Sequence, residues 1–174
     1  MLLPVIGRRA MLGCAASLAF AQIAGALPAL LRKPAGKPIL TVSGKISQTN
    51  DGGVARFDAP LLESLGTASF ITSTPWYDHP VQFEGVRLDR IMQAVDAKGE
   101  TVRATALDDY ASELPVSDFA KFGTLLALKV GGQYVSVKDK GPCFIIYPFD
   151  RFPELANSKY YSRSVWQVAT IDVF

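Results

Sequence analysis

The feature that most constrains the fold is a series of short β-forming segments, each bounded by glycine, proline or asparagine. The clearest pair is Leu125–Val130 and Gln133–Val137, which flank Gly131-Gly132. A Gly-Gly pair suits the tight turn of a two-residue hairpin, because glycine accepts positive φ without steric cost. Further strands are predicted at Ile39–Ile46, Thr67–Ser73, Thr101–Ala106, Tyr110–Leu114, Phe144–Tyr147 and Thr170–Val173.

Helical patterns are few and short. Asp58 can cap a helix that runs to Leu65, and Ser117 can cap another that ends near Phe122. A third helix is predicted over Arg87–Ala97, because apolar residues recur there at helical spacing. The stretch Thr74–Pro80 contains two prolines and is predicted to be a loop.

Strands without regularly alternating helices indicate an α+β domain with mixed β-sheets and a few short helices. The chain has 174 residues, of which 49% are hydrophobic. That length and composition are enough for one sizeable core.

The N-terminal residues have the composition of an export signal. Arg8-Arg9 precedes an apolar run from Ala10 to Leu31, and Ala24-Gly25-Ala26 offers small residues for cleavage. We therefore expect a signal peptide over residues 1–26, of general secretory or twin-arginine type. A linker over 27–38 and a domain over 39–174 follow, and the mature protein is expected in the periplasm. An uncleaved membrane anchor is the alternative.

Charge and cysteine content narrow the function classes further. Cleavage after residue 26 removes Arg8 and Arg9 and leaves 16 basic residues against 16 acidic ones. A neutral domain gives no reason to expect nucleic-acid binding. Cleavage also removes Cys14, so Cys143 stands alone and is expected to be a buried apolar residue.

Two segments near the C-terminus carry a resemblance to a known family. Asp139-Lys140-Gly141-Pro142-Cys143-Phe144-Ile145-Ile146-Tyr147-Pro148 is followed by Ser162-Arg163-Ser164-Val165-Trp166-Gln167-Val168. Together they resemble the cofactor-holding end of the sulfite-oxidase-type molybdopterin-binding domain, and the resemblance extends from about Thr41 to Val173. It implies a sulfite-oxidase-like fold with a cleft for a pterin.

The resemblance also implies a molybdenum-binding cysteine, which this chain lacks. The corresponding stretch is Phe70-Ile71-Thr72-Ser73-Thr74-Pro75-Trp76, where hydroxyls stand in place of the thiol. His79 is the single histidine, so a histidine metal site cannot be assembled, and we expect it in a polar loop at a pocket rim. No metal site and no catalytic residue is predicted.

Several side chains suit a flat heterocycle. Trp76 can stack on one. The carboxylate of Asp109, or secondarily of Asp108, can accept two adjacent N–H groups of a pterin, unless it only supports its own turn. Arg163 can donate to ring acceptors, with a surface ion pair as the alternative.

The resemblance adds further residues to this site. Asp109-Tyr110 stands where the family has an Asp-Gly-Tyr turn, and Ser164-Val165-Trp166 matches the segment that lines the pterin. Trp166 replaces a lysine and Phe144 an arginine, although Phe144 is expected to be core. The hydroxyl of Tyr147 is expected to hydrogen-bond in the cleft, and Lys138, Asp139 and Lys140 are expected at its rim.

These observations favour an exported pterin-binding sensory protein that holds no cofactor tightly and takes a pterin as its ligand. Relatives of this type suggest a membrane-bound signalling enzyme of cyclic-di-GMP metabolism as partner. The alternative is a molybdopterin-dependent oxidoreductase. A purely structural adaptor is the third hypothesis, and it predicts that Trp76, Asp109 and Trp166 do not converge.

Overall fold

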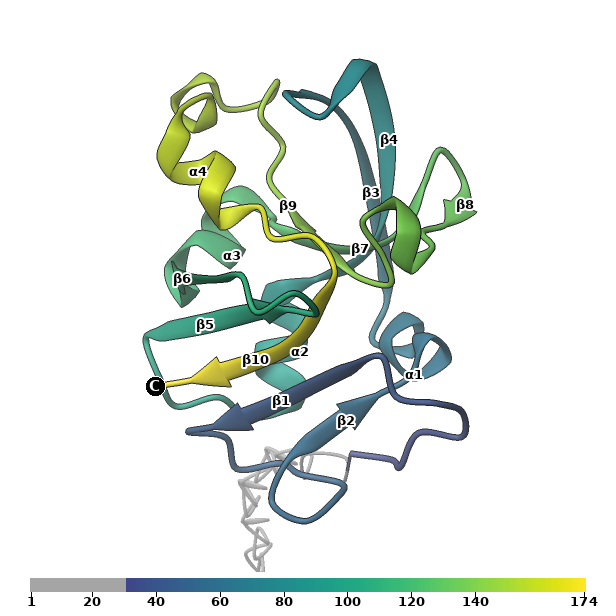
Figure 1. The fold of residues 1–174 in the computed structure, drawn as a ribbon. Coiled ribbons are helices and arrows are strands. Elements are labelled where there is room, and N and C mark those ends of the chain that lie inside the picture. Colours follow the sequence, from purple (N-terminus) through teal and green to yellow (C-terminus); the bar gives the residue numbers. More distant parts are fainter. Residues whose placement is uncertain (1–30) are drawn as a thin grey trace, which may run out of the picture.

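A computed structural model describes residues 31–174 as two β-sheets with short helices packed around them (Figure 1). The first sheet has the strand order β2-β1-β10-β5-β6. Only β1 and β10 run parallel, and the other neighbours are antiparallel. Its strands are β1 (Leu40–Gly44), β2 (Ala55–Phe57), β5 (Thr101–Ala106), β6 (Ala111–Pro115) and β10 (Val168–Val173).

The second sheet is antiparallel throughout the pairings described. Its order is β3-β4-β7-β8, and β9 also pairs with β7. The strands are β3 (Thr67–Thr74), β4 (Tyr77–Arg87), β7 (Leu125–Val130), β8 (Gln133–Tyr134) and β9 (Phe144–Ile146). One mixed sheet, one antiparallel sheet and four short α-helices confirm the predicted α+β class.

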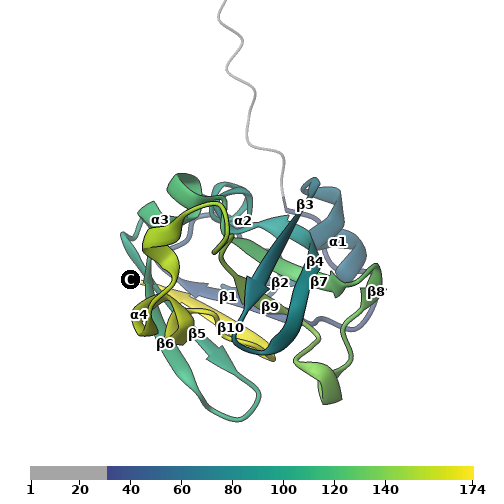
Figure 2. The same ribbon diagram turned by 90° about the horizontal axis from the view of Figure 1, so that it is seen from above.

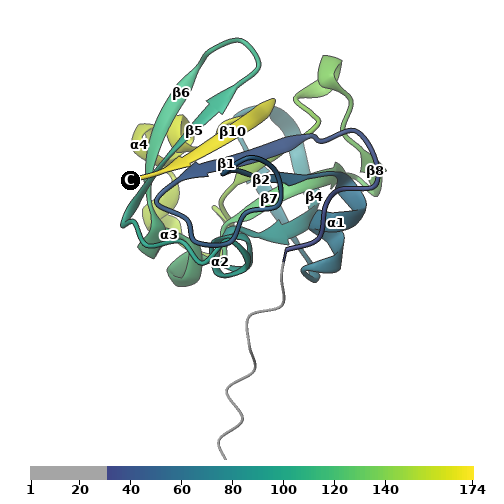
Figure 3. The same ribbon diagram turned by 90° about the horizontal axis from the view of Figure 1, so that it is seen from below.

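Three helices lie along one side of the molecule, as the views from above and below agree (Figures 2 and 3). They are α1 (Ala59–Ser64), α2 (Leu88–Ala94) and α3 (Val116–Phe122), whereas α4 (Ser158–Arg163) lies beside β6. Two short 3-10 helices, η1 (Val137–Asp139) and η2 (Pro153–Leu155), complete the described elements.

Both sheets and the helices α1 to α3 contribute to one hydrophobic core. The apolar stripe of α2 is buried through Leu88, Ile91 and Met92, as its spacing predicts. Phe57, Phe83, Phe119 and Phe144 are among the largest fully buried side chains. Burial of side chains of this size contributes roughly 1.5–3 kcal/mol each.

The predicted loop over Thr74–Pro80 is wrong. Thr74 pairs with Tyr77 across a two-residue turn, and β4 continues through Pro80. Pro80 is tolerated because β4 pairs with β7 only from Phe83 onward, so Pro80 has a strand neighbour on one side. The consequence is a long β3–β4 hairpin that carries Trp76 at its tip.

Several helix and strand ends differ from those predicted from the sequence. Pro115, not Ser117, is the N-cap of α3. The helix predicted to reach Ala97 ends at Ala94, because Asp96 adopts a left-handed backbone with φ 48°. The strand predicted to reach Val137 ends at Tyr134. Strand β2 and helix α4 were not predicted.

The chain entering the domain is held by hydrogen bonds. Gly36 N–H donates to Asp58 Oδ2 at 2.6 Å, and the Asn50 side-chain amide donates to the Arg32 carbonyl at 2.6 Å. Asp58 also caps α1 by accepting from Leu61 N–H at 2.9 Å. The predicted signal peptide and the start of the linker lie outside the described residues. Within residues 31–174, no helix is long and apolar enough to cross a membrane.

Candidate functional site

Two tryptophans meet at a pocket of about 340 Å³. Trp76 and Trp166 lie 5.7 Å apart between ring centroids, with their planes at 86°. The lining consists of these two rings with Lys138, Lys140 and Gln167. An aromatic wall beside cationic and amide groups is the composition expected of a site for a polar, planar ligand.

Trp76 is positioned by the β3–β4 hairpin. Its backbone N–H donates to Thr74 Oγ1 at 3.3 Å. The hairpin is fixed to the segment after β9, because Asp150 Oδ2 accepts from Ser73 N–H at 2.7 Å and from Ser73 Oγ at 3.1 Å. Figure 1 shows the hairpin rising beside this segment. These hydrogen bonds fix the position of the hairpin tip, and therefore of Trp76, relative to the core.

The ring of Trp76 is also held by other aromatic side chains. It packs edge-on against Phe144 at 5.6 Å, Tyr161 at 6.1 Å and Phe149 at 6.4 Å between centroids. Contacts of this kind contribute about 0.5–1.5 kcal/mol each beyond area burial. The aromatic wall is therefore largely preformed, which lowers the entropic cost of binding a ligand.

Trp166 lies in the segment that joins α4 to β10. Val165 C=O accepts from Ile145 N–H at 2.8 Å, and Val168 N–H donates to Cys143 C=O at 2.9 Å. The segment on either side of Trp166 is thus tied to β9 and to the residue before it. These bonds join the segment that leads into β10, the central strand of the first sheet, to β9 of the second sheet.

Gln167 connects three segments around the pocket. Its N–H donates to Lys140 C=O at 2.9 Å, and its C=O accepts from Leu107 N–H at 2.9 Å. Its side-chain amide donates to Val137 C=O at 2.6 Å. The β5–β6 turn and the η1 segment are therefore both fastened to the residue that follows Trp166.

Two residues that line the pocket have strained backbones. Of the four non-glycine residues with positive φ in the described chain, Lys140 at 75° and Gln167 at 52° line the pocket, whereas Asp109 at 66° and Asp96 at 48° lie outside its lining. Such conformations cost of order 1–3 kcal/mol each and cluster at functional sites. Gly141 follows Lys140, and a Cβ there would lie 2.0 Å from Val135 C=O, so only glycine fits. The strain supports the pocket as a site under functional constraint.

The two lysines occupy the exposed side of the pocket. Lys140 Nζ lies 5.1 Å from the ring centroid of Tyr77 and 5.8 Å from that of Trp166. Burial, and secondarily the Asp139 carboxylate, raises the pKa of Tyr77, so its hydroxyl stays protonated near neutral pH. Lys138 and Lys140, which were predicted at the rim of a pterin cleft, line this pocket.

The predicted acidic recognition residues lie outside this lining. Asp109 and Tyr110 are exposed in the β5–β6 turn, and Tyr110 O–H donates to Ser162 C=O at 2.9 Å. Asp108 Oδ1 accepts from Tyr110 N–H at 3.1 Å, so it supports its own turn. The structure brings Trp76 and Trp166 together but does not bring Asp109 to the pocket they line.

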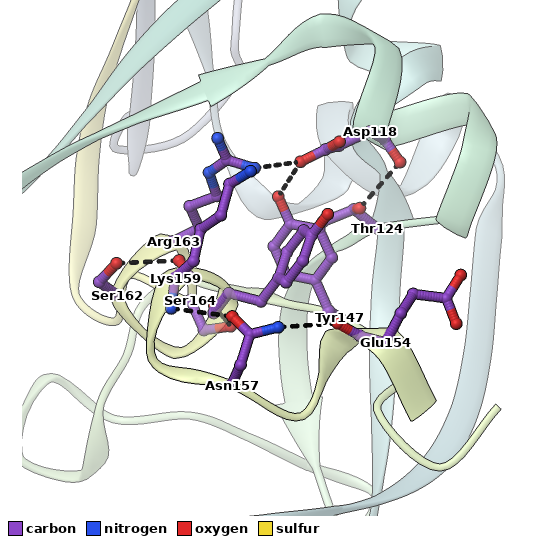
Figure 4. Close-up of polar contacts among 10 residues, drawn as sticks. Asp118, Thr124, Tyr147, Glu154, Asn157, Lys159, Ser162, Arg163 and Ser164 are labelled. Atoms are coloured by element: carbon purple, nitrogen blue, oxygen red, sulfur yellow. Dashed lines mark hydrogen bonds and ion pairs between the residues drawn. The ribbon is translucent and has the colours of Figure 1, made fainter. Parts of the chain in front are cut away.

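Tyr147 and Arg163 belong to a separate network (Figure 4). Asp118 Oδ2 accepts from Tyr147 O–H at 3.1 Å and pairs with Arg163 Nη1 at 2.9 Å. Arg163 therefore forms an ion pair, but one that is largely buried and not at the surface. Ser164 Oγ donates to Tyr160 C=O at 3.0 Å, so its hydroxyl caps the C-terminal turn of α4. None of these three lines the pocket.

The remaining candidates fall as follows. Cys143 is fully buried, as expected, and burial raises the pKa of its thiol to about 12. Phe144 is core, as expected. His79 is exposed on strand β4 and not in a loop, because β4 begins at Tyr77 and includes this residue. Asp139 accepts from Ser136 Oγ at 2.7 Å and does not line the pocket.

The donor set does not suit a metal. Residues 31–174 contain no group of three or more histidine, cysteine, aspartate or glutamate side chains that could hold one. Ser73, in the stretch where the thiolate is expected by resemblance, is bonded to Asp150. The Cys143 thiol is buried and protonated, so it offers no soft ligand.

A larger cavity of about 810 Å³ lies between residues 31–35 and the helices α1 and α2. We do not choose it as the site, because no aromatic side chain lines it and the described chain begins at its edge.

A scan against protein-family models finds no match for this chain, and a search of curated proteins finds no significant match.

Proposed function

We propose that this protein is an exported, non-catalytic pterin-binding protein related to the sulfite-oxidase-type molybdopterin-binding domain. The single observation that carries the proposal is the convergence of Trp76 and Trp166 on one pocket. These two residues come from segments 90 positions apart and were selected from the sequence as ring-stacking candidates.

The pocket offers the interactions that a pterin needs. A heterocycle that stacks on an exposed tryptophan face gains roughly 1–3 kcal/mol, by analogy with base-stacking platforms. The ammonium groups of Lys138 and Lys140 can donate to the ring oxygen and nitrogen acceptors. The side-chain amide of Gln167 donates to Val137 through nitrogen, and its oxygen is a suitable acceptor for a ring amino group.

The donor set favours binding over molybdenum chemistry. A molybdopterin-dependent oxidoreductase of this type needs a thiolate ligand, and Cys143 cannot supply one from the core. The oxidoreductase hypothesis therefore requires a metal held without cysteine. No reaction step is proposed.

The proposed location is based on the sequence, and the proposed partner on the family resemblance. The Arg8-Arg9 pair and the apolar run to Leu31 support export to the periplasm. The family resemblance supports a sensory role in which the pterin-bound state is read by a membrane-bound enzyme of cyclic-di-GMP metabolism. This partner is part of the proposal.

Calorimetric titration with a simple pterin tests the proposal. The parent protein should bind. Loss of the ring on which the ligand stacks, in Trp76→Ala or in Trp166→Ala, should weaken binding about tenfold to a hundredfold, and loss of the other ring should weaken it less, because the two planes stand at 86° and a flat ligand meets the second ring edge-on. His79→Ala is the control, because this exposed side chain lies outside the pocket lining and its removal should leave affinity unchanged. Asp109→Ala should also leave affinity unchanged, since the geometry places that carboxylate outside the lining.

Two outcomes would contradict the proposal in different ways. If no pterin binds to the parent protein, a structural adaptor is favoured. If elemental analysis of the protein purified from its natural compartment finds about one molybdenum or tungsten per chain, the oxidoreductase hypothesis is restored.

A further inference from the structure

The charged side chains of the tryptophan pocket are all of one sign. Lys138 and Lys140 line it, and no carboxylate is among its lining residues. Asp139 stands between them in sequence but is bonded to the Ser136 hydroxyl. The pocket therefore presents positive charge next to an aromatic wall.

This charge is not neutralised by contact. Seven ion pairs join side chains of residues 31–174, and neither Lys138 nor Lys140 is in any of them. Lys129, by contrast, contacts Glu84 at 2.9 Å and Glu63 at 3.3 Å. Lys129 is thus paired with two carboxylates, whereas Lys138 and Lys140 are available to bind an anion.

The backbone conformation of Lys140 sets the direction in which its side chain leaves the chain. The residue adopts φ 75°, and its C=O accepts from Gln167 N–H at 2.9 Å. Its Nζ lies over the rings of Tyr77 and Trp166, at 5.1 and 5.8 Å from their centroids, and so stands at the aromatic wall of the pocket. An acidic group on a ligand bound at this wall would meet this ammonium.

We propose that the pocket is selective for a planar heterocycle that carries an acidic substituent, either carboxylate or phosphate. The rings of Trp76 and Trp166 contact the heterocycle, and Lys138 and Lys140 bind the acidic group. The inference rests on the proposed function for the location of the site, but it does not require the heterocycle to be a pterin.

The expected size of the effect follows from charge-assisted hydrogen bonding. Such bonds are about twice as strong as neutral ones. In a partly exposed pocket we expect the acidic form of a ligand to bind on the order of tenfold to a hundredfold more tightly than its neutral counterpart. The preference should weaken with added salt, because the lysines are solvent-accessible.

Calorimetry with matched ligand pairs tests the proposal. The first pair is pterin-6-carboxylate and 6-hydroxymethylpterin, and the second is riboflavin 5′-phosphate and riboflavin. Each is titrated into the parent protein and into the double variant Lys138→Gln/Lys140→Gln, at low and at high salt. Lys121→Gln is the control, because Lys121 lies 4.3 Å from the Phe122 ring centroid and shares the cation–π arrangement without lining the pocket.

The parent protein and Lys121→Gln should prefer the acidic member of a pair, and the double variant should lose that preference while still binding the neutral member. Equal binding of both pterins, unchanged in the double variant, would overturn the proposal and leave the pterin function standing. If only riboflavin 5′-phosphate binds, and does so through the lysines, the pterin function fails and the acidic-group selectivity holds. Absence of binding by all four ligands would overturn both.

Discussion

Replacement of Asp118 should destabilise the fold strongly. The Oδ2 atom of Asp118 accepts hydrogen bonds from Arg163 Nη1 on α4 at 2.9 Å and from the buried Tyr147 O–H at 3.1 Å. The side chains of Arg163 and Asp118 are only 14% and 10% exposed. The change Asp118→Ala therefore leaves a guanidinium and a phenol in a largely dry site without their acceptor.

The magnitude follows from what is left behind. Removing one partner of a buried ion pair costs about 3–5 kcal/mol, because the other charge stays uncompensated. The residual exposure of Arg163 allows some hydration, so we expect the lower end, about 3 kcal/mol. The loss of an acceptor for Tyr147 is included in this figure. Against a typical stability of about 5–15 kcal/mol, the variant should fold with a clearly reduced midpoint.

The chain supplies a matched control at its surface. Glu113 pairs with Arg103 at 2.8 Å, with side chains 52% and 57% exposed. Glu113→Ala removes the same chemistry at nearly the same distance but in water, and should cost less than about 1 kcal/mol. The comparison isolates burial as the cause.

Urea unfolding followed by tryptophan fluorescence measures both variants, because Trp76 and Trp166 are partly buried against the core and become exposed on unfolding. Tyr147→Phe should cost about 1 kcal/mol, since it removes one donor but leaves the ion pair intact. If Asp118→Ala and Glu113→Ala lose equal stability, the network is not buried in solution and the reasoning fails.

Three further predictions concern other parts of the molecule. Asp58→Ala should cost about 1 kcal/mol at neutral pH through the lost helix cap. The Gly36 hydrogen bond holds the pKa of Asp58 below its usual value, so its contribution is complete above the usual carboxyl range near 4 and is lost as pH falls; thermal melts of parent and variant should therefore converge in acid. Cys143, with a pKa raised to about 12, should resist alkylation at pH 8 until urea unfolds the chain, and rapid labelling of the native protein would contradict its burial. Gly85→Ala should destabilise by several kcal/mol, because its Cβ would lie 2.1 Å from Leu126 C=O, and an unchanged melting temperature would show that β4 and β7 can separate.

Strands with strong local signals could be predicted from the sequence with correct bounds. Thr101–Ala106 and Leu125–Val130 are found as predicted, because β-branched and apolar residues between turn signals specify them locally. Strand β4 was missed, since Pro80 argues locally against a strand and only the sheet position makes it acceptable. Helix α4 has no buried residue of its own, and its ion pair to Asp118 spans 45 positions.

The site shows the same division. Trp76 could be selected because an aromatic residue directly after a strand suggests stacking, and Trp166 because its segment resembles one that lines a pterin; both choices are independent of long-range geometry. Arg163 and Tyr147 could not be assigned, because their partner Asp118 lies on a different helix and nothing near them in sequence marks it. Gln167 was missed because its role depends on backbone bonds and on φ 52°, which residue type does not reveal.

The pocket lies where the two sheets meet, and its two walls contribute differently to ligand binding. Its aromatic wall is fixed by the β3–β4 hairpin, by the Asp150 bonds and by rings from the core, so it can offer stacking without rearrangement. Its charged wall consists of Lys138, which is exposed in the 3-10 helix η1, and Lys140, which is half-buried at the end of that helix. The rings give affinity to any planar ligand, whereas the two cations respond to the charge at the ligand's edge. Affinity should therefore depend mainly on the tryptophans, and discrimination between ligands mainly on Lys138 and Lys140.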